Sequence, residues 1–363
     1  MSIGRSVWVC LFCFSVAAGW AQQNGTAGRS EPAAASASAS DRGMTLDVVV
    51  TDKSGKPVAG LQQEDFTLLD NKQPVKILSF RGVDGGAAVA DRPVEVILLF
   101  DEINTVFSKM ASAREQVKKY LQKFNGELPV PYSIAYVTPR GLMMEETPTR
   151  DANALVANLD RIGNGLRAIT SSQGASGAAE RQQWSLSYLR GLAKELADRP
   201  GRKLAIWISP GWPMRTGPGM YLSAKDKQWL FDAIVALSGD LRVADITLYH
   251  VDPQGMDVAD AGGMRSFYYT EFLNGVKTPE QAQNGNLSLQ VLAVQSGGRV
   301  LNSGNDVARD IATCVADANA YYAVTFDSLP GDGPNEYHAI EIKLGKRGLK
   351  TLTRTGYYAQ PGR

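Results

Sequence analysis

Short apolar runs alternate with segments of helical periodicity over most of the chain. The first run, residues 94–100, is apolar at nearly every position and ends at Asp101. An apolar run of this kind is typical of a central strand that is buried on both faces of a parallel sheet. After it, apolar residues from Phe107 to Phe124 recur at the spacing of an amphipathic helix.

The same alternation continues as far as residue 326. We expect further strands at residues 132–137, 204–209, 246–251 and 322–326. We expect further helices at residues 155–162, 185–196, 229–241, 287–294 and 306–318. Strands and helices that alternate at this spacing predict an α/β fold with a doubly wound, mostly parallel sheet covered by helices on both faces. This predicted domain spans residues 92–328.

Both ends of the remaining chain have the pattern of β-strands without intervening helices. The expected strands are residues 45–51, 66–69, 75–80, 338–344 and 351–358. Neither end has enough apolar surface for a core of its own. We therefore predict a small antiparallel β-sandwich domain built from both chain ends, residues 44–91 and 329–363, with the α/β domain inserted into it.

The first 21 residues have the pattern of a secretory signal peptide. Arg5 precedes an apolar stretch, and small residues at positions 19 and 21 favour cleavage after Ala21. The alternative, a short membrane anchor, is disfavoured because the apolar run is too short to span a bilayer comfortably. We therefore expect an exported protein, periplasmic or secreted, without a transmembrane segment in the mature chain. Residues 22–43, rich in Ala, Ser and Gly, predict a disordered tether.

Composition narrows the choice of partners and the means of stabilisation. Lys and Arg total 38 against 37 for Asp and Glu, so the formal net charge is +1. This balance gives no reason to expect nucleic acid or an anionic membrane surface as a partner. Without the signal peptide one cysteine remains, Cys314, so we expect no internal disulfide. Its spacing places it on the buried face of a helix, where we expect it to pack.

Polar side chains gather at the point where the first central strand ends. Asp101, Asn104 and Thr105 offer a carboxylate, a carboxamide and a hydroxyl close together in the sequence. In open α/β sheets, ligands bind beyond the carboxyl ends of the strands. Hard oxygen ligands of this kind suit magnesium or calcium rather than zinc.

The segment Leu98 to Asp101, with the polar loop and long helix after it, resembles the opening of a von Willebrand factor A domain. Further blocks resemble a bacterial, acidobacterial-type family related to that domain, and they lie at residues 46–81, 201–204, 208–212, 251–255, 292–298, 321–324, 337–342 and 354–357. Together these blocks cover nearly all of the mature chain. The resemblance implies a von Willebrand factor A-like, Rossmann-like fold. In that family a divalent ion is bound by an Asp-x-Ser-x-Ser loop, a Thr in a second loop and an Asp after a later strand.

This sequence departs from the ion-binding pattern of the family at two positions. Ile103 stands where the pattern has Ser, and Ser209 stands where it has the later Asp. We therefore predict a degenerate site that binds magnesium or calcium weakly, because affinity falls with ligand charge. Its residues would be Asp101, Asn104, Thr105, Ser209 and, for the second-loop Thr, Thr170. The alternative is that Asp101 and Asn104 cap the following helix or bond its first free N–H groups.

No motif in the sequence indicates catalysis, and we assign no catalytic residue. His250 and His338 lack the spacing of zinc ligands, and we expect His250 in the core. The sequence contains neither a G-x-S-x-G nucleophile elbow nor a G-x-x-x-x-G-K-[ST] phosphate loop. The predicted function is an adhesion-type binding module for a protein or envelope ligand. The alternatives are an envelope-associated hydrolase or metal-dependent enzyme acting at the Asp101/Ser209 edge, and a structural role without a ligand.

Aromatic residues are frequent in or beside the predicted loops that follow strands. We predict that Trp212, Tyr221 and Tyr268 form a partner-binding rim around the Asp101 edge, since aromatic residues are enriched at interfaces. The alternative is that Trp229 packs in the core and the other aromatic residues cover it. The segment 255–283 is long and lacks periodicity, and loops of that size are usually functional or mobile.

Overall fold

The computed structural model describes residues 43–84, 92–163, 174–214, 221–254, 269–302, 304 and 306–361. All of them belong to one compact unit, residues 39–363. The predicted signal peptide, nearly all of the predicted tether, Thr170 and Tyr268 lie outside the described residues.

A seven-stranded sheet forms the centre of the α/β part, with the strand order β11-β10-β9-β5-β6-β7 and β8 paired with β6. Its parallel strands are β5 (Val94–Asp101), β6 (Glu127–Thr138), β9 (Arg202–Ile208), β10 (Ile246–Val251) and β11 (Val300–Leu301). Two short strands run antiparallel to β6, namely β7 (Gly141–Met144) and β8 (Thr149–Asp151). The prediction of a mostly parallel sheet is confirmed.

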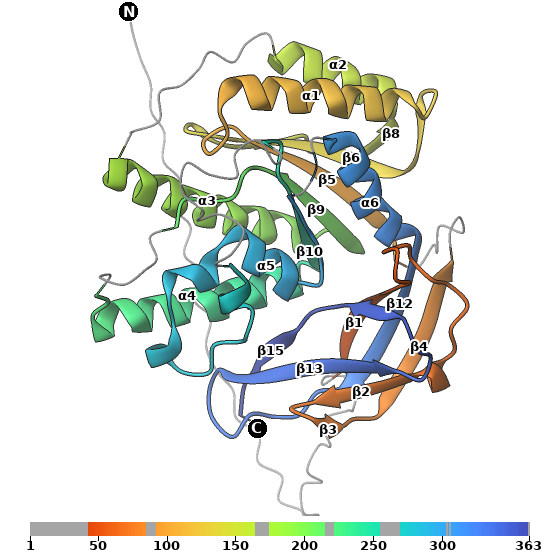
Figure 1. Ribbon diagram of the computed structural model, residues 1–363, viewed down its shortest axis with the longest axis vertical. Helices are drawn as coiled ribbons and strands as arrows, with labels where there is room; N and C mark the ends of the chain where they lie inside the picture. The colour runs from red at the N-terminus through yellow and green to blue at the C-terminus, as the bar shows by residue number, and fades with distance from the viewer. Residues whose placement is uncertain are drawn as a thin grey trace, which may run out of the picture. The chain divides into compact units, whose positions relative to one another are not determined.

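Helices cover both faces of this sheet (Figure 1). The α-helices are α1 (Phe107–Gln122), α2 (Ala152–Gly163), α3 (Gly174–Leu196), α4 (Ala224–Val243), α5 (Leu289–Gln295) and α6 (Val307–Asn319). Short 3-10 helices are η2 (Gln63–Asp65), η4 (Tyr269–Phe272), η5 (Pro279–Gln281) and η6 (Asn284–Leu287). Alternate residues of β5 enter opposite cores: Ile97 and Leu99 pack with α3, α4 and α5, whereas Leu98 packs with α1, α2 and α6. Cys314 on α6 is buried in the second core, as predicted.

Two four-stranded antiparallel sheets are built from both ends of the described chain. Their orders are β14-β1-β12-β4 and β15-β13-β2-β3. The strands are β1 (Gly43–Thr51), β2 (Phe66–Asp70), β3 (Gln73–Pro74), β4 (Ile77–Asp84), β12 (Ala320–Asp327), β13 (Glu336–Leu344), β14 (Lys350–Leu352) and β15 (Gly356–Ala359). Side chains of both sheets, such as Val48 and Ile342, share one hydrophobic cluster, so the sheets pack as a sandwich.

One strand lies in a different sheet from the one predicted. Residues 322–326 were expected to complete the parallel sheet, but β12 pairs antiparallel with β1 and β4. Tyr322, Val324 and Phe326 enter the sandwich core, whereas Ala323 and Thr325 point out of it. Tyr321 and Ala323 on the other face pack in a second small hydrophobic cluster with Val49, so β12 is largely buried on both faces, which in the sequence is the pattern of a parallel strand.

Candidate functional site

Asp101 is the last residue of β5 and lies at the carboxyl edge of the parallel sheet. The register pairs Leu99 with Trp207 and Phe100 with Ile208, so Asp101 and Ser209 end two neighbouring strands. The Asp101 side chain is fully buried. The prediction that these two residues share one edge of the sheet therefore agrees with the strand register.

Both carboxylate oxygens of Asp101 accept hydrogen bonds from N–H groups of the chain. Trp207 Nε1 donates to Oδ2 at 2.9 Å. Asn104 Nδ2 donates to Oδ2 at 2.9 Å and to Oδ1 at 3.1 Å, and the Asn104 backbone N–H donates to Oδ1 at 3.1 Å. Asn104 Nδ2 also lies 2.9 Å from Ser185 Oγ on α3. The carboxylate thus links β5, β9 and the loop before α1, and Asn104 extends the network to α3.

Burial is the main influence on the ionisation of the acidic groups at this edge. Burial raises the pKa of Asp101, while hydrogen bonds from Trp207, Asn104 and Ser209 act in the opposite direction. Burial also raises the pKa of Glu102 to about 7, although Arg114, whose Nη2 lies 3.2 Å from its carboxylate, opposes the rise. Glu102 is therefore a group at this edge that changes charge near neutral pH.

Ser209 is held by its own loop. Its Oγ accepts a hydrogen bond from Gly211 N at 3.1 Å. Gly211 has a φ of +100°, and a Cβ there would lie 2.5 Å from Gln290 Nε2, so the turn requires glycine. His250 is buried as predicted, and its Nε2 lies 2.7 Å from the backbone carbonyl of Ser209.

The groups around Asp101 do not fit a divalent cation. A cation needs the carboxylate oxygens as ligands, but N–H hydrogens point at both of them, and the Trp207 indole can only donate. If the Asn104 side-chain amide were turned around, its oxygen instead of its NH₂ group would face the Asp101 carboxylate, and the hydrogen bonds from Nδ2 would be lost. Among the residues that the structure describes, no group of three or more His, Cys, Asp or Glu side chains could hold a metal ion. The metal site remains a prediction, and the N–H donors around Asp101 do not favour it.

The alternative to metal binding, that Asp101 and Asn104 cap helix α1, is wrong. The residue before α1 is Val106, and no side chain caps this helix end. The carboxylate instead accepts from Asn104 in the loop and from Trp207 on the neighbouring strand. Its role is to close the loop after β5 against the sheet.

The predicted aromatic rim is only partly present. Trp212 is buried, with its ring centroid 5.2 Å from that of Trp207 and an interplanar angle of 74°, so its assignment as a partner-binding residue is wrong. Tyr221 is 92% exposed. Trp229, offered as a core residue in the alternative, is 58% exposed. Tyr268 lies outside the described residues.

Further residues of this edge were missed or misplaced from the sequence. Trp207 was interpreted as part of a buried strand, and nothing in the sequence indicates that its indole N–H reaches Asp101. Val106 and Phe107, at the start of α1, are 57% and 52% exposed. The sequence pattern places Phe107 on the buried face of α1, but the first buried residue of this helix is Met110.

Comparisons with known proteins give weak structural likenesses. No protein-family model matches the chain, and a search of curated proteins finds no match either. The pilus adhesin SpaC from Lactobacillus rhamnosus GG is 10% identical over 84% of this chain and 49% of its own, with a TM-score of 0.38. The manganese-loaded Plasmodium vivax TRAP protein is 7% identical over 79% of this chain and 97% of its own, with a TM-score of 0.34. The SpRpn10 VWA domain is 13% identical over 45% of this chain and 89% of its own, with a TM-score of 0.22. The chain thus spans about half the length of the adhesin.

Proposed function

We propose that this chain is an exported, adhesion-type binding module of the von Willebrand factor A-like type. Its α/β part would present the carboxyl edge of the parallel sheet to a protein partner, without a bound metal ion. The observation that carries the proposal is the exposure of large apolar side chains at this edge: Val106, Phe107, Tyr221 and Trp229.

Topology places these residues at the same edge as Asp101. Helix α1 follows β5 and helix α4 follows β9, so both helices begin where parallel strands end. Val106 and Phe107 lie at the start of α1, on one face of the sheet, while Tyr221 and Trp229 lie at the start of α4, on the other. Exposed aromatic residues are enriched in the centres of protein interfaces. They would flank the partner from two sides.

The hydrogen bonds of Asp101 support this proposal by giving the edge a rigid base. They connect two strands, the loop before α1 and helix α3. A binding surface that is ordered before contact loses less entropy when a partner binds. The hydrolase alternative gains no support, because Ser209 is fully buried and its hydroxyl is not accessible to a substrate.

Export and localisation rest on residues 1–21 alone. The described helices are all too short or too polar to span a bilayer. An envelope-associated or secreted module would meet its partner outside the cytoplasm.

The test is capture of a partner from an envelope fraction by the immobilised mature chain, with and without EDTA. We expect EDTA to leave capture unchanged, and Phe107→Ser with Trp229→Ser to reduce it at least about tenfold, as for hot-spot aromatics. Val243→Ser is the matched control, because Val243 is 64% exposed at the opposite end of α4. Loss of capture with EDTA, or equal loss in the control, would contradict the proposal.

A further inference from the structure

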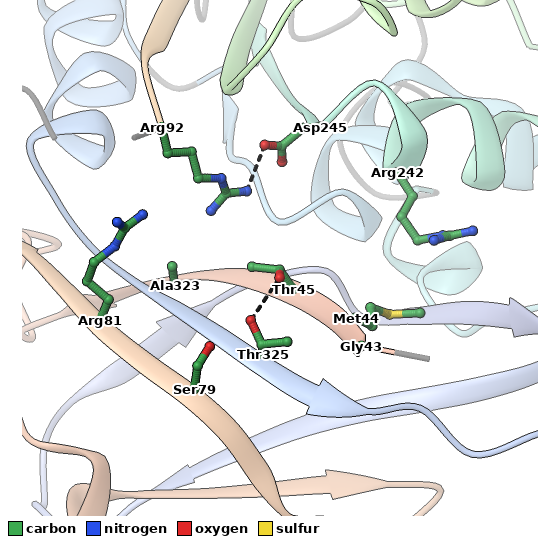
Figure 2. A pocket seen from close by; sticks show the side chains of 10 residues that line it. All are labelled: Gly43, Met44, Thr45, Ser79, Arg81, Arg92, Arg242, Asp245, Ala323 and Thr325. Carbon is green, nitrogen blue, oxygen red and sulfur yellow. Dashed lines mark hydrogen bonds and ion pairs between the residues drawn. The ribbon is translucent and has the colours of Figure 1, made fainter. Parts of the chain in front are cut away.

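A cavity of about 540 Å³, shown in Figure 2, lies between the sandwich and the α/β part. One wall is the outer face of strands β1, β12 and β4 of the sandwich. The other wall holds Arg92, just before β5, Asp245, just before β10, and Arg242 in the last turn of α4. These residues mark the amino edge of the parallel sheet, so the cavity is separate from the carboxyl edge.

The floor of the cavity is a row of hydroxyl groups. Thr45 on β1 pairs with Thr325 on β12, which pairs with Ser79 on β4. Their strand neighbours, such as Leu46 and Val324, face the sandwich core, so the three hydroxyls face the cavity. Thr45 Oγ1 and Thr325 Oγ1 lie 2.9 Å apart. Hydroxyls both donate and accept hydrogen bonds, and such a floor suits a polar ligand.

Two guanidinium groups lie at one end of this floor. Arg81 lies two residues after Ser79 on β4 and pairs with Ala323 on β12. The side chain of Ala323 is small and does not fill the cavity above it. Arg92 forms ion pairs with Asp47 at 2.5 Å and with Asp245 at 2.7 Å. Figure 2 shows Arg81 rising from β4 on the side of the cavity where Arg92 lies.

A third guanidinium group lies at the other end. Arg242 lies above Gly43 and Met44 in Figure 2, whereas the row that contains Arg81 crosses β1 at Asp47, four residues further along from Gly43. Arg242 is exposed, and among the described residues its guanidinium has no hydrogen bond or ion pair, although its backbone carbonyl accepts from Asp245 N. The cavity lining therefore carries three guanidinium groups and one carboxylate, that of Asp245.

The positive charge extends behind the lining. Arg202 is buried against Asp47 at 3.1 Å, and its guanidinium carbon lies 4.5 Å from the ring centroid of Tyr321. The pKa of Arg354 is lowered to about 10, first by burial and then by the positive charge of Arg242. Asp47 and Asp245 compensate Arg92 and Arg202, whereas the exposed guanidinium of Arg242 can receive an anionic ligand.

We propose that this cavity binds a small organic anion carrying two or more carboxylate or phosphate groups. One acidic group lies between Arg81 and Arg92, a second lies at Arg242, and the polar remainder lies on the Thr45, Thr325 and Ser79 hydroxyls. Guanidinium groups bind such oxyanions through paired N–H bonds. The cavity volume is in the range of small-molecule sites and exceeds that of a single oxyanion. This ligand would bridge the sandwich and the α/β part, and the proposal does not depend on the function of the carboxyl edge.

The test is isothermal titration calorimetry of the mature chain at constant ionic strength and without metal ions. The probes are citrate and pyrophosphate, which separate carboxylate from phosphate ligands, and acetate, which has one acidic group. We expect citrate or pyrophosphate to bind at least about tenfold more tightly than acetate, since each charged hydrogen-bond partner contributes this much or more.

Variants identify the site. Arg81→Gln with Arg242→Gln should weaken the tighter probe at least about tenfold. Arg140→Gln, which removes an exposed charge from the turn after β6, should leave binding unchanged. Thr325→Val tests the floor without changing charge and should weaken binding severalfold. Circular dichroism checks that each variant is folded. Absence of binding by both two-headed probes, equal binding of acetate, or binding that survives the double arginine substitution would overturn the proposal.

Discussion

The two edges of the parallel sheet carry polar groups in opposite states. At the carboxyl edge, Asp101 is buried and N–H donors of the chain itself occupy both of its oxygens. At the amino edge, guanidinium groups outnumber carboxylates around an open cavity. The general rule places ligands at the carboxyl edge. Here the lining with more cationic than acidic groups lies at the other edge, so the balance of charge, rather than fold position alone, indicates where a charged ligand binds.

The largest effect is expected from Asp47→Ala at the amino edge. Asp47 contacts both Arg92 and the buried Arg202, so its loss leaves two guanidinium groups with fewer partners. Breaking a buried ion pair from one side costs about 3–5 kcal/mol of unfolding free energy. Urea denaturation measures this loss. Glu64→Ala, at an exposed position of η2, is the control. A loss under about 1 kcal/mol would show that the arginines do not depend on Asp47.

Asp101→Ala should cost somewhat less, about 3 kcal/mol of unfolding free energy. The substitution leaves the Trp207 indole N–H and the Asn104 donors without an acceptor in a buried place. The loss should be the same with magnesium and with EDTA. If magnesium stabilised the wild-type chain but not Asp101→Ala, Asp101 would be a metal ligand. That result would contradict the contrast between the two edges.

The contrast at Asp101 could be predicted only in part from the sequence. The end of β5 and the neighbouring end of β9 follow from hydrophobic pattern, because uninterrupted apolar runs define buried parallel strands. The sequence could not show that the Trp207 indole donates a hydrogen bond, because a tryptophan in an apolar run has the same pattern whether it only packs in the core or also donates. The prediction also placed β12 in the wrong sheet. A short apolar strand that follows a helix is compatible both with an alternating α/β fold and with a β-sandwich, and the hydrophobic pattern does not distinguish the two.

The amino edge could not be predicted from the sequence at all. Asp47, Arg92, Arg202, Asp245 and Arg354 stand far apart along the chain, and no motif connects them. They meet because strands β5, β9 and β10 begin side by side and β1 packs against that edge. Charged residues that precede strands ordinarily indicate solvated turns, so only the folded arrangement shows their excess of positive charge.

A smaller effect is expected from pH at the carboxyl edge. Burial raises the pKa of Glu102 from 4.5 to about 7, so between these values the folded chain holds a proton that the unfolded chain releases. Stability should therefore fall as pH rises from about 4.5 to 7, by about 2 kcal/mol after allowance for partial exposure. Glu102→Gln should remove this slope, whereas Glu115→Gln, at an exposed position of α1, should keep it. If the pH dependence of stability were unchanged in Glu102→Gln, a group other than Glu102 would be responsible for it.

The smallest effect on stability is expected from the proposed partner-binding residues. Phe107→Ser and Trp229→Ser should each change the unfolding free energy by less than about 1 kcal/mol, because more than half of each residue is exposed to solvent. Thermal unfolding followed by circular dichroism measures this. A loss above about 2 kcal/mol would mean that the two residues support the fold and would remove them from the binding surface.

The most direct test of the contrast between the two edges is the melting temperature of the mature chain in three solutions of equal ionic strength. The first contains sodium chloride, the second magnesium chloride, and the third the tighter-binding of citrate and pyrophosphate. A ligand that binds only the folded chain stabilises it by RT ln(1 + L/Kd), where L is the free ligand concentration, so its melting temperature rises with the ratio of ligand concentration to Kd. We expect the organic anion or pyrophosphate to raise it and magnesium to leave it at the sodium chloride value. A rise with magnesium and none with the anion would contradict the account at both edges.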